Sequence, residues 1–294
     1  MPTWCPMRLI FRHLPWLLRR TLLASIDDGL FGMAKGAAYS ALLAFFPLLT
    51  SVAAVFVETR TEVVQGYLAR FLGQILPPGT ENVVLENFRF TGRRPVSLIV
   101  IAVVLSVFAA SSVIKSLIDG FNAAYKVPRN RSILGHAAMG MLLVFLAAVP
   151  LLAVSAMLLF EETTESVALK FLGIDPAGKP GPWWNLAADA ARYALAFLAT
   201  VSLTMILYYF GPHRRQQWRR VLPGAILATI FWLAATLGFG WYVRNVTNYN
   251  VLYGSVGTSI ALVVWMYLLA LIALIGCEFN AEIECLEAAM DSRH

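Results

Sequence analysis

Ionisable and amide side chains lie beside two of the most apolar stretches of the chain. Lys115 and Asp119 are one helical turn apart and Asn122 follows them, whereas Glu278 and Asn280 directly follow the last apolar stretch. Charged groups beside lipid pair with one another or line a path for a solute or a proton. The sequence therefore predicts an inner gate made of these five residues, with ordinary structural pairing as the alternative for each.

The chain carries one short catalytic pattern. Residues 112–115 read S-V-I-K and match the S-x-x-K of enzymes that act on cell-wall peptides, but neither S-D-N nor K-T-G follows in the sequence. Zinc-protease, nucleophile-elbow and phosphate-loop motifs are also missing from it. The histidines and cysteines do not have the spacing of metal ligands. We expect no enzyme activity, no catalytic residue, no cofactor and no metal site.

Six apolar stretches must position the candidate residues. They are 33–57, 96–117, 138–160, 186–210, 221–242 and 253–277. A hydrocarbon layer about 30 Å thick is crossed by about 20 residues of helix, and a helix satisfies its own backbone hydrogen bonds there. Hydrophobic residues make up 59% of the chain and charged residues 14%, with a mean hydropathy of +0.69. The predicted fold class is all-α, a polytopic membrane bundle of six transmembrane helices.

The charge pattern predicts orientation and organisation. Lys and Arg concentrate in the N-terminal arm and in the loops after the second and fourth stretches. Such loops remain in the cytoplasm, so both termini are predicted there. We expect a cytoplasmic amphipathic arm over 1–32, with an interfacial helix over 8–30, a membrane domain over 33–284 and a short cytoplasmic tail over 285–294.

Two segments are predicted on the outer side. Apolar residues recur at helical spacing within the loop 58–95, which predicts an amphipathic extracytoplasmic helix, either on the membrane surface or as a cap over a cavity. Tyr249, Tyr253 and Gly254 lie where the sixth stretch begins. They are either part of an interfacial aromatic belt or, if the backbone is unwound there, the outer mouth of a solute path.

Proline and glycine mark bends and close contacts within the stretches. Pro47 interrupts the first one and is either a hinge or a static kink. Gly32 with Gly36, and Gly224 with Ala228, have the spacing at which two helices approach closely. Packing within the chain is the first interpretation of these pairs, and association of two copies is the second.

Several motifs occur together in order along the chain. They are AAYSALLAFFPL at 37–48, FNAAYKV at 121–127, WRRVLPGA at 218–225, YGS at 253–255, WMY at 265–267 and GCEFNAE at 276–282. With these motifs the chain resembles the YihY/virulence factor BrkB family of bacterial inner-membrane proteins. It departs from the usual pattern at Phe121, where Leu is common, and at Cys277, where Ala is common.

The resemblance implies six spans, an inner-membrane location and a transport or export role with no settled substrate. Some members of the family were once labelled ribonuclease BN. We reject that activity because a metal-dependent nuclease requires clustered ligands, whereas the four histidines of this chain are scattered.

The leading hypothesis is a transporter or exporter of small polar or amphiphilic solutes. The alternative is a membrane scaffold that transports nothing, or a lipid-handling envelope protein. The expected partners are membrane lipids, a small-molecule solute and a second copy of the chain, and no nucleic acid.

Overall fold

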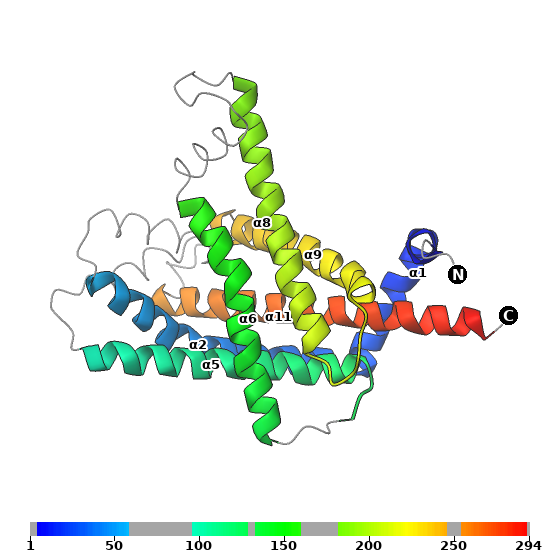
Figure 1. Cartoon of the computed structure of the whole chain (residues 1–294), viewed down its shortest axis with the longest axis horizontal. Helices are drawn as coiled ribbons and strands as arrows, with labels where there is room; N and C mark the ends of the chain where they lie inside the picture. Colours follow the sequence, from blue (N-terminus) through cyan, green and yellow to red (C-terminus); the bar gives the residue numbers. More distant parts are fainter. Residues whose placement is uncertain (1–4, 59–95, 129–132, 160–181, 246–253, 293–294) are drawn as a thin grey trace.

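The computed structural model describes residues 5–58, 96–128, 133–159, 182–245 and 254–292. These residues form seven helices and no strand, which confirms the predicted all-α class (Figure 1). The helices are α1 (Cys5–Asp27), α2 (Leu30–Glu58), α5 (Val96–Ala124), α6 (Ile133–Leu159), α8 (Pro182–Phe210), α9 (Trp218–Asn245) and α11 (Gly254–Asp291).

Four of the described helices are long and apolar enough to cross a membrane. The qualifying segments are Val100–Ala124, Tyr193–Phe210, Trp218–Tyr242 and Ile260–Asp291, and shorter apolar segments lie at Leu30–Phe45 and Leu134–Pro150. Each predicted span thus falls on a helix, while six membrane crossings remain a prediction. The last helix is longer than expected, because α11 continues past Cys277 through Glu278 and Asn280 to Asp291.

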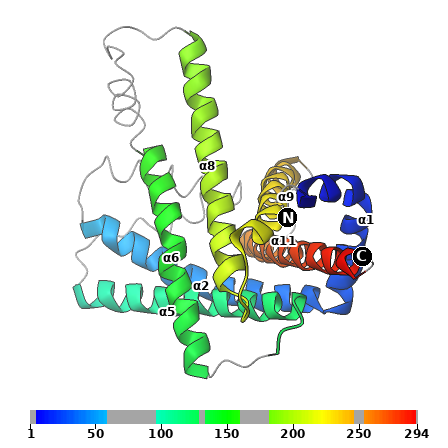
Figure 2. The ribbon, with the colours of Figure 1, turned by 45° about the vertical axis from the view of Figure 1, so that its right-hand side comes forward.

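Six helices contact one another in the order in which the chain forms them. α2 packs on α5, α5 on α6, α6 on α8, α8 on α9 and α9 on α11, and α11 packs back on α2. The α6–α8 pair crosses α2, α5 and α11 at a steep angle (Figures 1 and 2). α5 also contacts α11. The long helix α11 therefore connects the two ends of this sequence of contacts.

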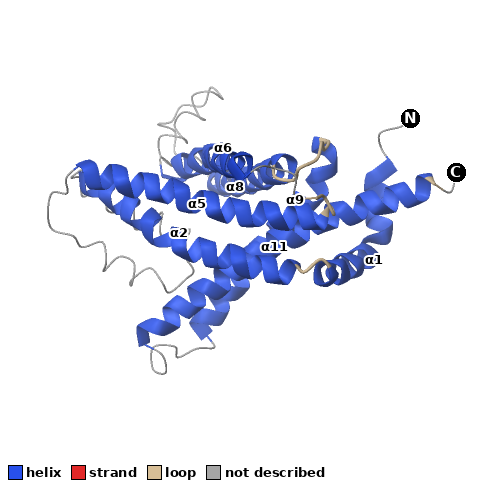
Figure 3. Cartoon of the chain, turned by 90° about the horizontal axis from the view of Figure 1, so that it is seen from below, coloured by secondary structure: helices blue, strands red, loops and turns tan. Residues whose placement is uncertain are grey.

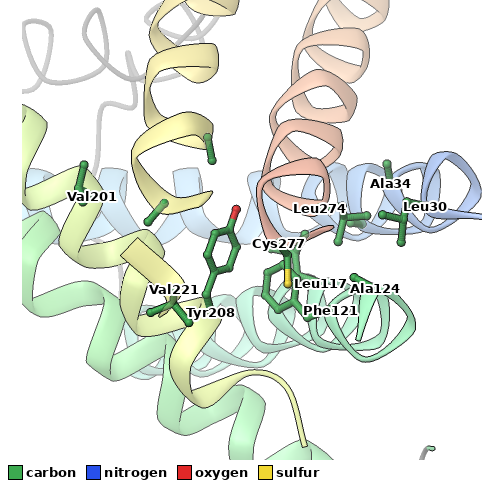
Figure 4. Close-up of a cluster of buried hydrophobic side chains, with 13 residues drawn as sticks. Leu30, Ala34, Leu117, Phe121, Ala124, Val201, Tyr208, Val221, Leu274 and Cys277 are labelled. Atoms are coloured by element: carbon green, nitrogen blue, oxygen red, sulfur yellow. The ribbon is translucent and has the colours of Figure 1, made fainter. Parts of the chain in front are cut away.

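α8, α9 and α11 approach one another closely around Tyr208 and Gly276. Tyr208 is fully buried, donates a 2.6 Å hydrogen bond to the carbonyl of Ala273, and contacts Phe121 edge to face with 5.3 Å between ring centroids. Figure 4 shows its ring lying between α8 and the neighbouring helices. A side-chain carbon on Gly276 would lie 2.5 Å from the Tyr208 hydroxyl oxygen and 2.7 Å from the Ala228 Cβ. Only glycine fits at position 276.

The two predicted small-residue pairs differ in their surroundings. A side-chain carbon on Gly224 would collide with the carbonyl of Gly276, so the Gly224–Ala228 pair packs within the chain against α11. Gly32 and Gly36 are exposed, and a carbon built on either meets no atom within 4 Å in the part of the chain that the structure describes. The expectation of close packing within the chain is therefore wrong for Gly32 and Gly36.

Helix α1 lies on α11 at the end of the molecule where both termini lie (Figures 1 and 3). Fully buried Leu17 packs against Phe279 and Ile283 of α11. The helix ends at Asp27, before Gly29, whose φ of +69° is a left-handed conformation that favours glycine. A helix thus lies over the predicted segment with slightly different bounds, and one of its faces is docked on the bundle. Its location at the membrane interface stays a prediction.

Candidate functional site

Four segments that are far apart in the sequence meet at what we call the polar end. They are the α1–α2 turn at Asp28–Gly29, the end of α5 at 122–127, the loop 211–217 and residues 277–287 of α11. Lys126 lies 4.0 Å from Asp28, the backbone N–H of His213 donates to the Asn122 side chain at 2.8 Å, and Arg214 pairs with Glu284. These contacts join the four segments. Glu278, near the start of the α11 segment, packs beside them.

The end of α5 is shaped by its cap. The N–H of Lys126 donates to the carbonyl of Ala123 and that of Val127 to the carbonyl of Asn122, both at 2.9 Å. Lys126 adopts a left-handed φ of 54°, which is unfavourable for a residue with a side chain. This conformation closes the helix one turn after Asn122 and brings the Lys126 ammonium to Asp28.

Asn280 joins α11 to the first turns of α9. Its Oδ1 accepts from the N–H of Gly224 at 2.7 Å, and its Nδ2 donates to the carbonyl of Val221 at 3.1 Å. Pro223, which has no backbone N–H, lies between these two groups, and the fully buried amide bonds to the backbone on either side of it. Asn280 is thus explained as a structural joint between two helices.

Glutamates of α11 pair with arginines from three other segments. Glu282 lies 2.5 Å from Arg20 of α1, Glu284 pairs with Arg214 of the loop, and Glu287 lies 3.7 Å from Arg220 of α9. The charges of these carboxylates are therefore compensated, and each pair attaches a different segment to α11.

Tyr125 follows α5 directly, and its ring lies under the Arg214 guanidinium at 4.3 Å from the centroid. Its hydroxyl is buried with no hydrogen-bond partner among the described residues. Burial raises the pKa of the phenol well above its ordinary value, and the nearby Cys277 and Glu284 add to the effect. Tyr125 is therefore a neutral hydroxyl group at physiological pH.

Glu278 is the one glutamate of this group without an arginine. It is 1% exposed, its Oε2 has no hydrogen-bond partner, and it forms no ion pair among the described residues. The Asp28 and Glu282 carboxylates repel it, and Lys126 attracts it. Burial of a carboxylate without a partner is unfavourable by several kcal/mol. Pairing with an arginine explains why the other three glutamates of α11 are there, but it does not explain the presence of Glu278.

Lys115 and Asp119 lie on the face of α5 that packs against α6. The Lys115 ammonium is 5.4 Å from the centroid of the Phe108 ring, and the Asp119 carboxylate is 3.5 Å from the His136 imidazole. A carbon on Gly140 of α6 would lie 2.9 Å from the Lys115 side chain. The structure thus places three of the predicted gate residues, Asn122, Glu278 and Asn280, at the polar end. It places Lys115 and Asp119 against α6.

Other predicted residues are described less fully. Tyr249, Tyr253 and the loop after Glu58 lie outside the described residues, and Gly254 begins α11. Pro47 lies within α2, which continues on both sides of it.

Asp28, Tyr125, Tyr208 and Gly276 were not predicted for these roles. Only the Asp28–Gly29 turn signal could have pointed to one of them, since the rest depend on contacts between distant segments. The described residues contain no group of three or more His, Cys, Asp or Glu side chains that could hold a metal.

Comparison with known proteins relates most of the chain to one family. A family model described as virulence factor BrkB matches residues 22–293. A protein named ribonuclease-like protein YfkH, from Bacillus subtilis, is 26% identical over 254 residues, which cover 85% of this chain and 89% of that protein. No solved structure matches.

Two further relatives carry the name UPF0761 membrane protein. The one from Pseudoalteromonas atlantica is 26% identical over 78% of this chain and 66% of its own length. The one from Alkalilimnicola ehrlichii is 27% identical over 86% of this chain and 55% of its own length. This chain therefore spans only about half to two thirds of these two relatives.

Proposed function

The chain belongs to the virulence factor BrkB family of membrane proteins, and from that premise we propose that it is a transporter or exporter of small polar or amphiphilic solutes. It lies in the bacterial inner membrane with six spans: α2, α5, α6, α8, α9 and α11. The proposal does not include the ribonuclease activity in the name of YfkH.

The proposed orientation places the polar end in the cytoplasm. Lys126 and Arg214 belong to it, Arg220 of α9 pairs with its Glu287, and α1 with the arginines of its second half is docked beside it. Basic residues at span ends are retained on the cytoplasmic side. Both termini are then cytoplasmic, and the polar end is the inner end of any solute path.

The observation that carries the transport proposal is the burial of Glu278. An ionisable group in a membrane bundle that is buried without a cation is unfavourable for stability, and such groups mark ion, proton or substrate paths. We assign Glu278 as the inner gate residue that binds a proton or a cationic group of the solute. Asn122 and Asn280 hold the segments around it through their backbone hydrogen bonds.

The remaining parts of the predicted path complete the proposal. Lys115 and Asp119 belong to the inner gate from the α6 side, Pro47 is its hinge, and Tyr249, Tyr253 and Gly254 form the outer mouth. A scaffold that transports nothing needs no water in the middle of the bundle, so access of water to α5 and α11 distinguishes the two functions.

Cysteine labelling tests for such a path without knowledge of the solute. In a variant that lacks Cys5, Cys277 and Cys285, single cysteines replace Ser106 and Leu262, which are buried in α5 and α11. The control is Val104→Cys, because Val104 is 61% exposed on the outer surface of α5, where lipid covers it. A charged thiol reagent should label S106C and L262C and leave V104C unlabelled. If both buried positions stay unlabelled, the bundle is sealed and the transport proposal is wrong.

A flux measurement tests the assignment of Glu278. Proteoliposomes are loaded with ethidium, an amphiphilic cation, and its efflux is compared with that from protein-free liposomes. We expect faster efflux with the wild-type protein and at least a tenfold decrease with Glu278→Gln. Glu287→Gln is the matched control, because Glu287 lies on the same helix and is paired with Arg220. Equal efflux from E278Q and E287Q would contradict the gate role.

A further inference from the structure

A pocket of about 640 Å³ opens between α6, the end of α8 and the loop 211–217. One wall is apolar and is made of Met139, Tyr209 and Phe210. Trp218 holds the two aromatic rings, since it stacks on Tyr209 at 4.1 Å between centroids and meets Phe210 edge-on at 6.0 Å. The volume is within the range of sites for small ligands, and the ring contacts form this wall without a ligand.

The other lining residues include basic and polar ones. Arg214 and Arg215 both line the pocket, and no described lining residue is acidic. The charge of Arg214 is compensated by Glu284, whereas Arg215 is exposed and forms no ion pair among the described residues. Arg215 therefore places an uncompensated positive charge at the pocket.

Gln216 adds a side-chain amide that forms no hydrogen bond with the described residues. Both atoms of its side-chain amide, Nε2 and Oε1, are buried and have no hydrogen-bond partner among the described residues. A buried amide without partners is unfavourable by about 1–3 kcal/mol for each group. A ligand with hydrogen-bond acceptors would satisfy the amide donor.

We propose that this pocket binds the phosphate group of a membrane amphiphile. Arg215 and the Gln216 amide bind the phosphate oxygens, and the apolar part of the molecule lies on Met139, Tyr209 and Phe210. Basic pockets between membrane helices on the cytoplasmic side are typical sites for anionic headgroups. The site does not depend on the transport proposal.

The helices beside the pocket favour a lipid over free phosphate. Leu142 and Phe145 of α6 are 56% and 61% exposed, and Leu198 of α8 is 57% exposed. They give exposed apolar surface further along the two helices from Met139 and Phe210, toward the middle of each helix. An acyl chain can follow this surface while its phosphate remains in the pocket.

Displacement of a fluorescent lipid tests the proposal. The purified full chain in a neutral detergent is titrated with NBD-labelled phosphatidic acid, and the label is displaced with unlabelled phosphatidic acid, phosphatidylcholine or inorganic phosphate. We expect phosphatidic acid to displace the label at least tenfold more effectively than phosphatidylcholine, and inorganic phosphate to act only at a far higher concentration. Equal displacement by the two lipids would overturn a phosphate site. Displacement by inorganic phosphate at the lipid's concentration would overturn the assignment to an amphiphile.

Two variants locate the binding in this pocket. Arg215→Ala and Gln216→Leu should each weaken binding of phosphatidic acid at least fivefold. Arg219→Ala should leave it within twofold, because Arg219 is an exposed arginine of the same end that does not line the pocket. Thermal unfolding shows that each variant is folded. If R215A and R219A bind equally, general surface charge explains the affinity and the pocket is not the site.

Discussion

Single residues at helix crossings determine how closely the helices of this bundle approach. Gly276 lies where Tyr208 of α8 and Ala228 of α9 contact α11, and its missing side chain makes room for both. In a membrane, helices associate mainly through such packing and through polar contacts, because lipid is as apolar as the side chains. Stability should therefore be sensitive to very small changes at this position.

The first prediction compares two glycines. Gly276→Ala should lower the free energy of unfolding by about 1–3 kcal/mol, since the added carbon has no space. Gly36→Ala should leave stability unchanged or slightly higher, because no atom of the described residues would meet the added carbon and alanine favours helix. Thermal unfolding in detergent, followed by circular dichroism, measures both. Equal midpoints would contradict the packing at Gly276.

The second prediction concerns Asn280. Asn280→Ala leaves the N–H of Gly224 and the carbonyl of Val221 without their partner in a buried place. We expect a loss of about 1–3 kcal/mol for each group. The same unfolding measurement checks it, with Ser202→Ala as control, because Ser202 is exposed and bonds only within its own helix. If Asn280 were instead a gate residue without a structural role, N280A would unfold like wild type.

At the scale of elements, the attachment of α1 to α11 has an apolar and an ionic part. Leu17 is fully buried against Phe279 and Ile283, whereas the Arg20 side chain that pairs with Glu282 is half exposed. Truncation of a buried leucine lowers stability by about 2–5 kcal/mol. The ion pair joins a buried carboxylate to a guanidinium that solvent reaches, and this screening by solvent weakens it. The apolar contact should therefore dominate the docking of α1.

The third prediction follows from that difference. Leu17→Ala should raise amide hydrogen exchange in α1 at least tenfold, while Arg20→Ala should raise it less than about fivefold. Exchange in α6, which packs on α5 and α8, serves as the internal reference. A larger effect of R20A than of L17A would show that the ion pair, rather than the core around Leu17, holds α1 in place.

At the scale of the whole molecule, the two termini lie on the same side (Figure 1). This arrangement agrees with an even number of crossings, as six spans would give. The arginines that pair with α11 lie on the same side, so orientation and attachment of the segments involve the same residues.

The fourth prediction is the topology. Alkaline phosphatase fused at either terminus should be inactive in cells, and a green fluorescent protein at the C-terminus should be fluorescent, because both ends are predicted to lie in the cytoplasm. Phosphatase fused after Glu58, at the end of α2, should be active. Activity at one terminus but not the other would mean an odd number of spans.

The sequence by itself determined the elements. Long apolar stretches make helices in lipid because the transfer energy is a sum over neighbouring residues, so 96–117, 186–210 and 221–242 could be located without a structure. It also pointed to Asn122, Glu278 and Asn280, since polar residues at the ends of spans are conspicuous. The bounds and the long extension of α11 were less predictable, because the extension is stabilised by contacts with α1 and α9.

Only the tertiary structure decided which of these residues meet. Lys115 and Asp119 were grouped with Glu278, but the helical period turns them toward α6, while Leu117 and Phe121 are in the core with Leu274. The bond between Asn280 and Gly224 joins residues 56 positions apart. Whether a buried carboxylate has a partner depends on contacts between residues that are far apart in the sequence. A local pattern of residues does not predict such contacts.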